Sequence, residues 1–383
     1  MSDKKVVFLM RCFGYGNELL YMEPILAGFL KEFPKTVMLN LETKSIVRET
    51  GDRVLKMAPW KNIFGPIAVF LSVMSHLWKT LPELIILSEF DQTTFFGIYY
   101  RFFHKRTRIL LLVENDPGFL TFFYGVNRKN KLISFFRQWI VSHVDFILTN
   151  NDLGRRYLTE ELKVEANKIF VGPFLTSSIL YKSAIVPKIL NPGECLRLLT
   201  VSRIIEGKGI RFLLQALEEL PEDYLNRIHL TVVGDGPERQ SLESLAGKSG
   251  LKKSVTFVGK CPYDELGHYY ANAHVFVFPT LGDFRALANF EALSAGLPII
   301  GSIFDGTAGE AVEEGVNGFI LDPRDTKVLS EKIIRFLNEP NLIERFSIAS
   351  INKSKIFSVE KAISNLVQAC YLCCNETGSG ETQ

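Results

Sequence analysis

The stretch of this sequence that says most about its chemistry contains two carboxylates eight positions apart. Asp283 and Glu291 lie in PTLGDFRALANFEA, residues 279–292. The apolar run 273–278 predicts a buried strand that stops at Pro279, and helical spacing begins at Asn289. Ligands of open α/β sheets bind at the carboxyl ends of the strands. Both carboxylates should therefore flank one pocket, where they can accept hydrogen bonds from hydroxyl groups.

Two cations follow another predicted strand. Arg203 and Lys208 stand five positions apart in VSRIIEGKG, residues 201–209, where the strand ends and a helix begins. Glycines there would let the backbone approach a ligand closely. Fixed cations and helix N-terminal amides stabilise the charge that develops on a departing diphosphate without needing a metal. The segment suits a diphosphate, and the alternative is a surface loop with ordinary cations.

Glycine-rich turns follow the neighbouring predicted strands. Gly234 and Gly236 form a tight turn in VVGDGP, residues 232–237, and Gly259 ends the next strand before Lys260. A further loop, 302–310, is rich in glycine and ends in a glutamate. Glycine permits positive backbone torsions and close approach to phosphate oxygens. Each turn taken alone predicts no more than a turn.

Both halves of the chain alternate short apolar strands with segments of helical length, which predicts a doubly wound parallel sheet in each half. The two series are joined by a stretch containing Pro and Gly, residues 187–194. Strands are expected in the first half at 6–10, 36–39, 84–87, 108–113, 146–149 and 169–172, and in the second half at 196–201, 229–233, 254–258, 274–278, 298–301 and 318–321.

In order and spacing, these motifs resemble the donor-sugar site of the retaining nucleotide-sugar glycosyltransferases of family four, within the glycosyl transferases group 1. The resemblance covers roughly residues 196–340. It implies the GT-B architecture, an α/β fold of two Rossmann-like doubly wound domains facing a central cleft. We expect an acceptor-binding domain at 1–188, a donor-binding domain at 189–355, and at 356–383 a helix packing back on the first domain with a polar tail.

The resemblance also implies roles for individual residues. Arg203 and Lys208 would bind the donor diphosphate, Glu291 the ribose hydroxyls, and Asp283 a hydroxyl of the transferred sugar. The other expected donor-binding residues are Gly14, Gly16, Gly234, Gly236, Gly259, Lys260, Arg285, Ala286, Leu287, Gly306, Thr307 and Glu310.

This chain departs from the family pattern at the first carboxylate. The family has Glu where Asp283 stands, and usually Gly, an aromatic residue and Gly where Phe284, Arg285 and Ala286 follow. Arg285 has two interpretations. It pairs with Asp283, which we favour, or it recognises a charged donor such as a uronic acid by a bidentate contact.

The first half is harder to interpret, because the resemblance is weak before residue 190. Gly14 and Gly16 follow the first strand, where family members place a loop beside the donor phosphates, and a plain turn is the alternative. Glu89, Glu114 and Asp116 follow predicted strands and are candidates for acceptor contacts. Capping of a helix start is the alternative for Asp116.

Basic and aromatic residues gather in the first half. Ten of the thirty Phe lie between Phe90 and Phe136 among Lys and Arg, and residues 1–190 hold 25 basic against 17 acidic residues. This composition suits peripheral contact with an anionic membrane. A buried aromatic core with a solvated basic face is the alternative. The uncharged run 62–78 is too short to span a bilayer and predicts a buried or interfacial helix.

Composition limits the remaining classes of function. With 383 residues, 47% of them hydrophobic, the chain can bury two cores. Six Cys and no signal-peptide pattern ahead of Val6 predict a cytoplasmic protein, or a peripheral one on the inner face of the cell membrane. Asp-x-Asp, dinucleotide and P-loop motifs are missing. We therefore expect no metal and no cofactor, and the donor motifs argue against a nucleic-acid partner.

The predicted activity is retaining transfer of a hexose-type sugar from a UDP- or GDP-sugar to a glycan or lipid-linked acceptor, in surface polysaccharide or lipopolysaccharide synthesis. Retention is implied by the resemblance alone. One rival is a non-catalytic scaffold of a polysaccharide synthesis complex that binds nucleotide sugar or glycan. Another is an epimerase that acts on a nucleotide sugar alone and needs no acceptor.

Overall fold

A computed structural model describes residues 3–10, 18–40, 54–56, 65–90, 92–113, 131–174, 185–283, 285–339 and 341–375. The chain divides into two compact units. Unit 1 comprises Met1–Ser178 and Ser358–Gln383, and unit 2 comprises Ile179–Phe357. The division thus falls after residues 178 and 357, where the sequence prediction placed it after residues 188 and 355.

Unit 1 is built on a seven-stranded parallel sheet of order β3-β2-β1-β4-β5-β6-β7. Its central strands are buried along nearly their whole length, as expected for a parallel sheet covered on both faces. The strands are β1 (Val6–Met10), β2 (Val37–Asn40), β3 (Val54–Lys56), β4 (Leu84–Ser88), β5 (Arg108–Val113), β6 (Phe146–Thr149) and β7 (Ile169–Val171).

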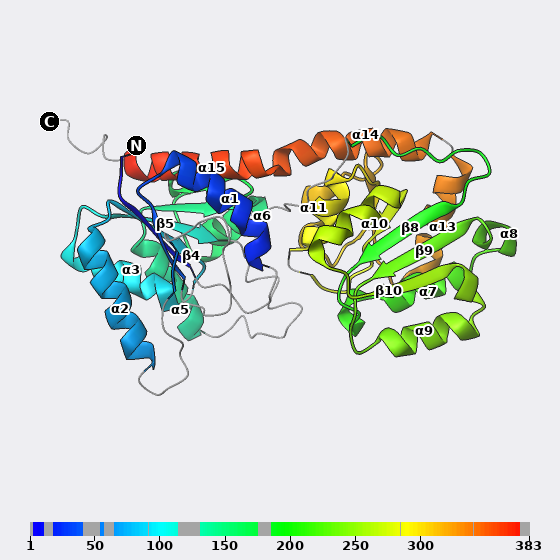
Figure 1. The fold of residues 1–383 in the computed structure, drawn as a ribbon, viewed down its shortest axis with the longest axis horizontal. Helices are drawn as coiled ribbons and strands as arrows, with labels where there is room; N and C mark the ends of the chain where they lie inside the picture. The colour runs from blue at the N-terminus through cyan, green and yellow to red at the C-terminus, as the bar shows by residue number, and fades with distance from the viewer. Residues whose placement is uncertain are drawn as a thin grey trace. The chain divides into compact units, whose positions relative to one another are not determined.

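Helices cover both faces of this sheet. α1 (Glu18–Glu32) and α15 (Val359–Asn375) share one core with β1 and β5, and Figure 1 draws the red α15 alongside the blue α1. α2 (Gly65–Thr80), α3 (Gln92–Phe103) and α5 (Lys131–Ser142) pack on the opposite face. The remaining helical segments are α6 (Asp152–Arg156), η2 (Tyr157–Glu161) and η3 (Ala166–Lys168).

Unit 2 contains a six-stranded parallel sheet of order β10-β9-β8-β11-β12-β13. Numbered from its first strand the order is 3-2-1-4-5-6, the doubly wound pattern in which strand order reverses between β8 and β11. The strands are β8 (Leu196–Val201), β9 (Ile228–Val233), β10 (Val255–Gly259), β11 (Val275–Val277), β12 (Ile299–Ser302) and β13 (Gly318–Leu321).

Two cores lie on the two faces of the second sheet. One includes side chains of α7, α9, α13 and α14, and the other side chains of α10, α11 and α12. The helices are α7 (Ile210–Glu218), α8 (Glu222–Leu225), α9 (Arg239–Lys248), α10 (Leu266–Asn272), α11 (Leu287–Ser294), α12 (Ala308–Ala311), α13 (Thr326–Asn338) and α14 (Leu342–Ser354), with short 3-10 turns η4 (Glu206–Lys208), η5 (Leu251–Lys253), η6 (Tyr263–Glu265) and η7 (Lys355–Phe357).

The predicted strands agree with the observed ones to within one or two residues at each end, and β3 is the strand that sequence patterning missed. The Cys370–Cys374 segment is helical within α15, and Cys370 and Cys373 are buried free thiols. Burial raises the pKa of both thiols, so they remain protonated and act as core side chains. Within the described ranges, the helices lack the length and hydropathy that crossing a membrane requires.

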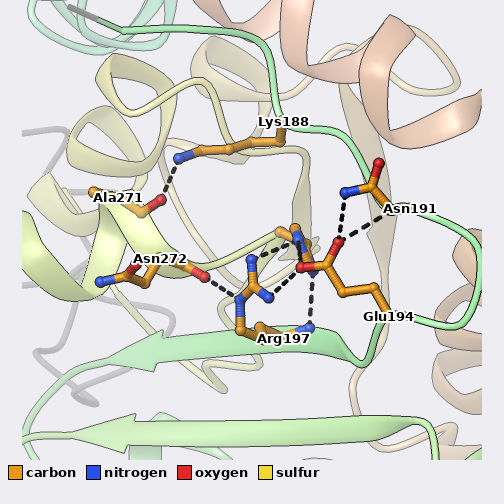
Figure 2. Close-up of polar contacts among 7 residues, drawn as sticks. Lys188, Asn191, Glu194, Arg197, Ala271 and Asn272 are labelled. Atoms are coloured by element: carbon orange, nitrogen blue, oxygen red, sulfur yellow. Dashed lines mark hydrogen bonds and ion pairs between the residues drawn. The ribbon is translucent and has the colours of Figure 1, made fainter. Parts of the chain in front are cut away.

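A polar network ties the start of β8 to the turn before β11 (Figure 2). Arg197 Nε donates to the carbonyl of Asn272 at 2.5 Å, and its Nη1 donates to Glu194 Oε1 at 2.5 Å. The backbone N–H of Arg197 donates to Nδ1 of the buried His274 at 3.1 Å. Burial, reinforced by the charge of Arg197, lowers the pKa of His274 to about 4.

The same network anchors the extended segment that precedes β8. Lys188 Nζ donates to the carbonyl of Ala271 at 2.7 Å, and Asn191 donates to Glu194 Oε2 through both its backbone and its side chain. The Lys188 N–H donates to Ser347 Oγ at 2.7 Å. The segment 185–195 is therefore held to α10 and α14 by directional bonds as well as by packing.

We expect His274 to lower the free energy of unfolding as pH drops from about 6.5 toward 4. The folded-state pKa of His274 lies below its ordinary value, so in this window the unfolded chain takes up a proton that the native state does not. The loss should be about 1–3 kcal/mol. Urea unfolding of wild type and His274→Asn between pH 7 and pH 5 would measure this loss as the difference between the two pH dependences. Asp305, whose pKa burial raises to about 7, titrates in the same window in both proteins and has the opposite effect on stability.

His274→Asn should remove this loss, so as pH drops its free energy of unfolding should fall less, or rise more, than that of the wild type. His229, half-buried on β9 and bonded to Thr256, provides the matched control, and His229→Asn should keep the wild-type slope. Equal slopes for wild type and His274→Asn would show that protonation of His274 does not contribute to the pH dependence.

Candidate functional site

The predicted donor-site residues of unit 2 gather at one edge of its sheet. Arg203 and Lys208 follow β8, Asp283 and Arg285 follow β11, and Thr307 follows β12. Because all six strands are parallel, their carboxyl ends lie at the same edge. The site therefore occupies the position where strand order reverses, which is where open α/β sheets bind ligands.

Glycines let the loops of this edge approach one another closely. Gly209 has φ 63°, and a Cβ there would lie 1.9 Å from the carbonyl oxygen of Pro279. Gly234 has φ 137°, and a Cβ would lie 1.8 Å from the carbonyl oxygen of Ser202. No other residue type fits either position without moving the backbone. These two of the predicted glycines thus have a demonstrable structural requirement.

Hydrogen bonds lock the loop after β8 to the loop after β11. The carbonyl of Gly207 accepts from the Leu281 N–H at 2.8 Å and from Thr280 Oγ1 at 3.0 Å. Lys208 Nζ forms an ion pair with the Asp283 carboxylate, and the two side chains are 15% and 19% exposed. The ammonium group also lies 5.5 Å from the centre of the Phe278 ring. A cation predicted to bind diphosphate and a carboxylate predicted to bind sugar are therefore neighbours.

The loop after β12 completes the site through a buried aspartate. Asp305 accepts from the N–H and the hydroxyl of Thr307, at 3.0 and 2.9 Å, and from the side chain of Asn289. Its neighbour Gly306 donates to the carbonyl of Asp283 at 2.9 Å. Burial, and then the charge of Asp283, raise the pKa of Asp305 to about 7, although these hydrogen bonds oppose the rise. Its charge therefore changes near neutral pH.

The favoured interpretation of Arg285 was wrong. Arg285 pairs with Glu310, its Nη1 lying 3.1 and 3.2 Å from the two carboxylate oxygens, and not with Asp283. Its guanidinium packs 4.8 Å from the centre of the Phe290 ring, and the side chain is only 4% exposed. Asp283 has Lys208 as its partner, and the buried position of Arg285 directs its charge toward Glu310. This pair joins the start of α11 to α12.

Glu291 lies deeper than a surface ligand contact. Its side chain on α11 is 2% exposed, and Tyr270 of α10 donates to its Oε2 at 2.6 Å. This hydrogen bond joins the carboxylate to α10. The contact of Glu291 with a ribose stays a prediction.

The remaining predicted donor residues differ in exposure. Arg203 and Lys260 are exposed, Leu287 is half-buried, and Ala286 is buried in the core beside α11. The structure assigns no ligand to them, so their binding roles stay predictions. Two glycines fit closely against other groups, since a Cβ on Gly236 would meet the Ile204 carbonyl oxygen at 2.3 Å and one on Gly259 would meet the Arg239 guanidinium at 2.5 Å.

In unit 1, Glu89 has an unusual backbone. It follows β4 with φ 63°, which is rare for a residue other than glycine. Its N–H donates to the Leu112 carbonyl at 2.9 Å, and its own carbonyl accepts from Thr94 Oγ1 at 2.8 Å. Strained backbone of this kind collects at functional sites. Gly14, Gly16, Glu114 and Asp116 lie outside the described residues.

Sequence reasoning missed three residues that shape the site. Asp305, Asn289 and Tyr270 hold the loop after β12 and the Glu291 carboxylate in place. An aspartate and an asparagine at these positions gave no signal, because their pairing depends on which side chains are buried together. Across the described part of the chain, no three His, Cys, Asp or Glu side chains converge as metal ligands would.

Solved structures share this architecture across nearly the whole chain. Anabaena HepE in complex with UDP has a TM-score of 0.74 at 16% identity and covers 96% of this chain and 99% of its own. The lipopolysaccharide outer core galactosyltransferase WaaB, in its apo form, has a TM-score of 0.73 at 15% identity with the same coverage. The fold of two Rossmann-like domains is therefore that of the GT-B glycosyltransferases, as predicted.

Sequence comparison then identifies the type of domain. Residues 182–353 match the model described as Glycosyl transferases group 1. An uncharacterised glycosyltransferase of Methanocaldococcus jannaschii is 22% identical over 78% of this chain and 76% of its own length. The O-antigen chain mannosyltransferase B of Escherichia coli is 27% identical over 58% of this chain and 59% of its own length. Residues 182–353 therefore form a domain of the Glycosyl transferases group 1 type.

Proposed function

We propose that the protein transfers a hexose-type sugar from a UDP- or GDP-sugar to a glycan or lipid-linked acceptor, with retention of configuration and without a metal. The observation that carries the proposal is the convergence of three interlocked loops around Lys208 and Asp283. A cation and a carboxylate side by side suit a ligand that carries phosphate next to hydroxyl groups.

Each of the neighbouring groups has a chemical part in this reaction. As the bond between the sugar carbon and the diphosphate oxygen breaks, negative charge grows on the diphosphate, where Lys208 and Arg203 stabilise it. The acceptor hydroxyl forms the new bond on the same face and gives its proton to the departing oxygen. Asp283 accepts a hydrogen bond from a hydroxyl of the sugar. This hydrogen bond replaces the ion pair that Asp283 forms with Lys208 when no ligand is bound. No protein nucleophile takes part.

The descriptions of related proteins support a biological setting for this proposal. The curated mannosyltransferase builds O-antigen chains, and WaaB is described as acting on the lipopolysaccharide outer core. HepE has been solved with UDP and with UDP-glucose. These descriptions support a UDP-sugar donor and a role in surface polysaccharide or lipopolysaccharide synthesis.

A non-catalytic scaffold is the second candidate, and one observation favours it. Both Lys208 and Arg285 already have carboxylate partners, Asp283 and Glu310, so the site is largely neutralised without a ligand. A scaffold would bind a nucleotide sugar and leave it unchanged. Release of nucleoside diphosphate from a bound donor in the presence of acceptor glycan separates the two candidates.

Thermal-shift measurements with UDP-glucose, GDP-mannose, ADP-glucose and a CMP-sugar test the donor site. A ligand at a hundred times its Kd stabilises the native state by about 2.7 kcal/mol. We expect one nucleoside-diphosphate sugar to raise Tm, and the same shift with EDTA, because the phosphate contacts come from side chains. The CMP-sugar, a monophosphate, should have little effect.

The control uses two arginines of the same unit. Arg203→Ala should abolish the shift, whereas Arg227→Ala should retain it, since Arg227 is exposed and precedes β9 at the opposite end of the sheet. A shift that survives in Arg203→Ala would place the nucleotide elsewhere. A shift that EDTA removes would contradict metal independence.

A further inference from the structure

Three helices on one face of the unit 1 sheet contain no acidic residue. α2, α3 and α5 together carry Lys and Arg but no Asp or Glu. Their inner sides pack on the sheet, and their outer sides expose ten large apolar residues. Leu71 on α2, Phe102 on α3 and Phe135 on α5 are 60%, 58% and 61% exposed. We call this surface the aromatic face.

The aromatic rings of this face contact one another instead of turning inward. Trp78 on α2 lies 6.3 Å from Phe103 on α3, and Phe103 lies 5.3 Å from Tyr99. Further along, Phe95 on α3 lies 6.1 Å from Phe136 on α5. Exposed aromatic residues of a soluble protein are usually scattered, and a contiguous layer over three helices marks a surface that meets another apolar phase.

A cationic cavity of about 530 Å³ opens at one end of this face. Arg101, Phe102 and Lys105 line it from the end of α3, Arg108 from the start of β5, and Lys168 from the residue before β7. The cavity lies where these strands begin, at the end of the sheet opposite the strands' carboxyl ends. A volume of this size suits a small ligand or a headgroup.

Positive charge exceeds negative charge among the residues that line the cavity. Asp145 is the acidic residue there, and it accepts from Arg101 at 2.9 Å and from Arg108 at 2.6 Å. The two guanidinium groups and the one carboxylate together have a net charge of +1. Lys105 adds a second, and within the described residues it has no ion pair; Lys168 lies 3.6 Å from the exposed Glu165. An anion such as a phosphate group complements this lining.

We infer that the aromatic face docks on an anionic phospholipid bilayer, with its exposed rings in the headgroup region and one lipid phosphate in the cationic cavity. Exposed aromatic and apolar side chains next to uncompensated Lys and Arg bind in this way at a membrane interface. A protein partner fits less well, because protein interfaces are depleted in lysine and pair opposite charges, and the three helices offer no acidic residue. Docking does not depend on the proposed sugar transfer.

Cosedimentation with vesicles tests the inference. The full-length protein should bind vesicles of three parts phosphatidylcholine to one part phosphatidylglycerol and should not bind pure phosphatidylcholine. Lys105→Gln with Lys168→Gln should weaken partitioning roughly tenfold or more, since each lysine near an anionic surface contributes about 1 kcal/mol. Phe102→Ser with Phe135→Ser should weaken it by a similar factor, because rings no longer enter the headgroup region.

Controls separate the inference from general charge attraction and from misfolding. Ile348→Ser on α14 removes an exposed apolar residue of unit 2, and Lys252→Gln with Lys253→Gln removes two exposed lysines there, so both variants should bind as wild type does. Every variant must keep the wild-type Tm and circular dichroism. No vesicle binding, or equal losses in the controls, would overturn the inference. So would saturable binding of inorganic phosphate in the cavity with vesicle binding unaffected by the two Phe substitutions, which would point to a free phosphate ligand.

Discussion

Lys208→Ala should lower kcat/KM for the donor sugar at least tenfold, which corresponds to about 1.4 kcal/mol of lost transition-state stabilisation. The Lys208 side chain is 15% exposed and its ammonium group lies 5.5 Å from the centre of the Phe278 ring, so it acts in surroundings where water screens it little. Charge on a departing diphosphate would be stabilised there more in the transition state than in the bound donor. The larger loss should therefore appear in kcat.

Loss of Lys208 also removes the partner of Asp283, and a structural effect must be separated from a chemical one. Lys208→Arg keeps the charge and should retain more activity than the alanine variant, at a similar Tm. Lys252→Ala, an exposed lysine of the same unit, serves as the control and should leave kcat/KM unchanged. A folded Lys208→Ala protein with wild-type kcat/KM would refute the diphosphate role.

Gly209→Ala should destabilise unit 2 by about 2–4 kcal/mol and abolish nucleotide binding. The residue has φ 63°, and its new Cβ would lie 1.9 Å from the Pro279 carbonyl oxygen, a backbone atom that cannot rotate away. This clash can be relieved only if the loop that carries Lys208 separates from the loop that begins at Pro279. Urea unfolding would measure the loss of stability, and the nucleotide thermal shift would report the loss of the site.

The same loop supplies a matched control. Gly207 lies two positions earlier, and a Cβ there would meet no atom within 4 Å. Gly207→Ala should therefore change stability by no more than about 0.5 kcal/mol and keep nucleotide binding. If both alanine variants behave alike, the close approach of the two loops does not matter to the site.

Sequence patterning was sufficient for most of the fold because parallel strands are buried on both faces and appear as continuous apolar runs. All six strands of unit 2 were found in this way. β3 was missed because its three residues, Val54–Lys56, include a lysine and follow Asp52 and Arg53, whereas β7, an edge strand of the same length, is apolar throughout. Strand ends also placed Arg203, Lys208 and Asp283 correctly at one edge.

Partners within the site could not be predicted from spacing. Arg285 is two positions from Asp283, whereas Lys208 is 75 positions away. The choice of Lys208 over Arg285 depends on side-chain depth, because Arg285 is buried against Phe290 and Glu310. The importance of Asp305 likewise depends on its complete burial next to Asn289 and Thr307. Such contacts join residues about 15 to 75 positions apart, where one sequence offers no local signal.

The core of unit 1 is completed by α15, which follows unit 2 in the sequence. Leu366, Cys370 and Cys373 of α15 enter the same core as Phe8 and Phe29, and a Cβ on Gly28 would collide with Ile363. During synthesis this core stays open until all of unit 2 has been made, so the unit that is translated first is the last to be completed. Premature termination anywhere in residues 179–357 would therefore release a first unit with an uncovered sheet face, a target for chaperones and proteases.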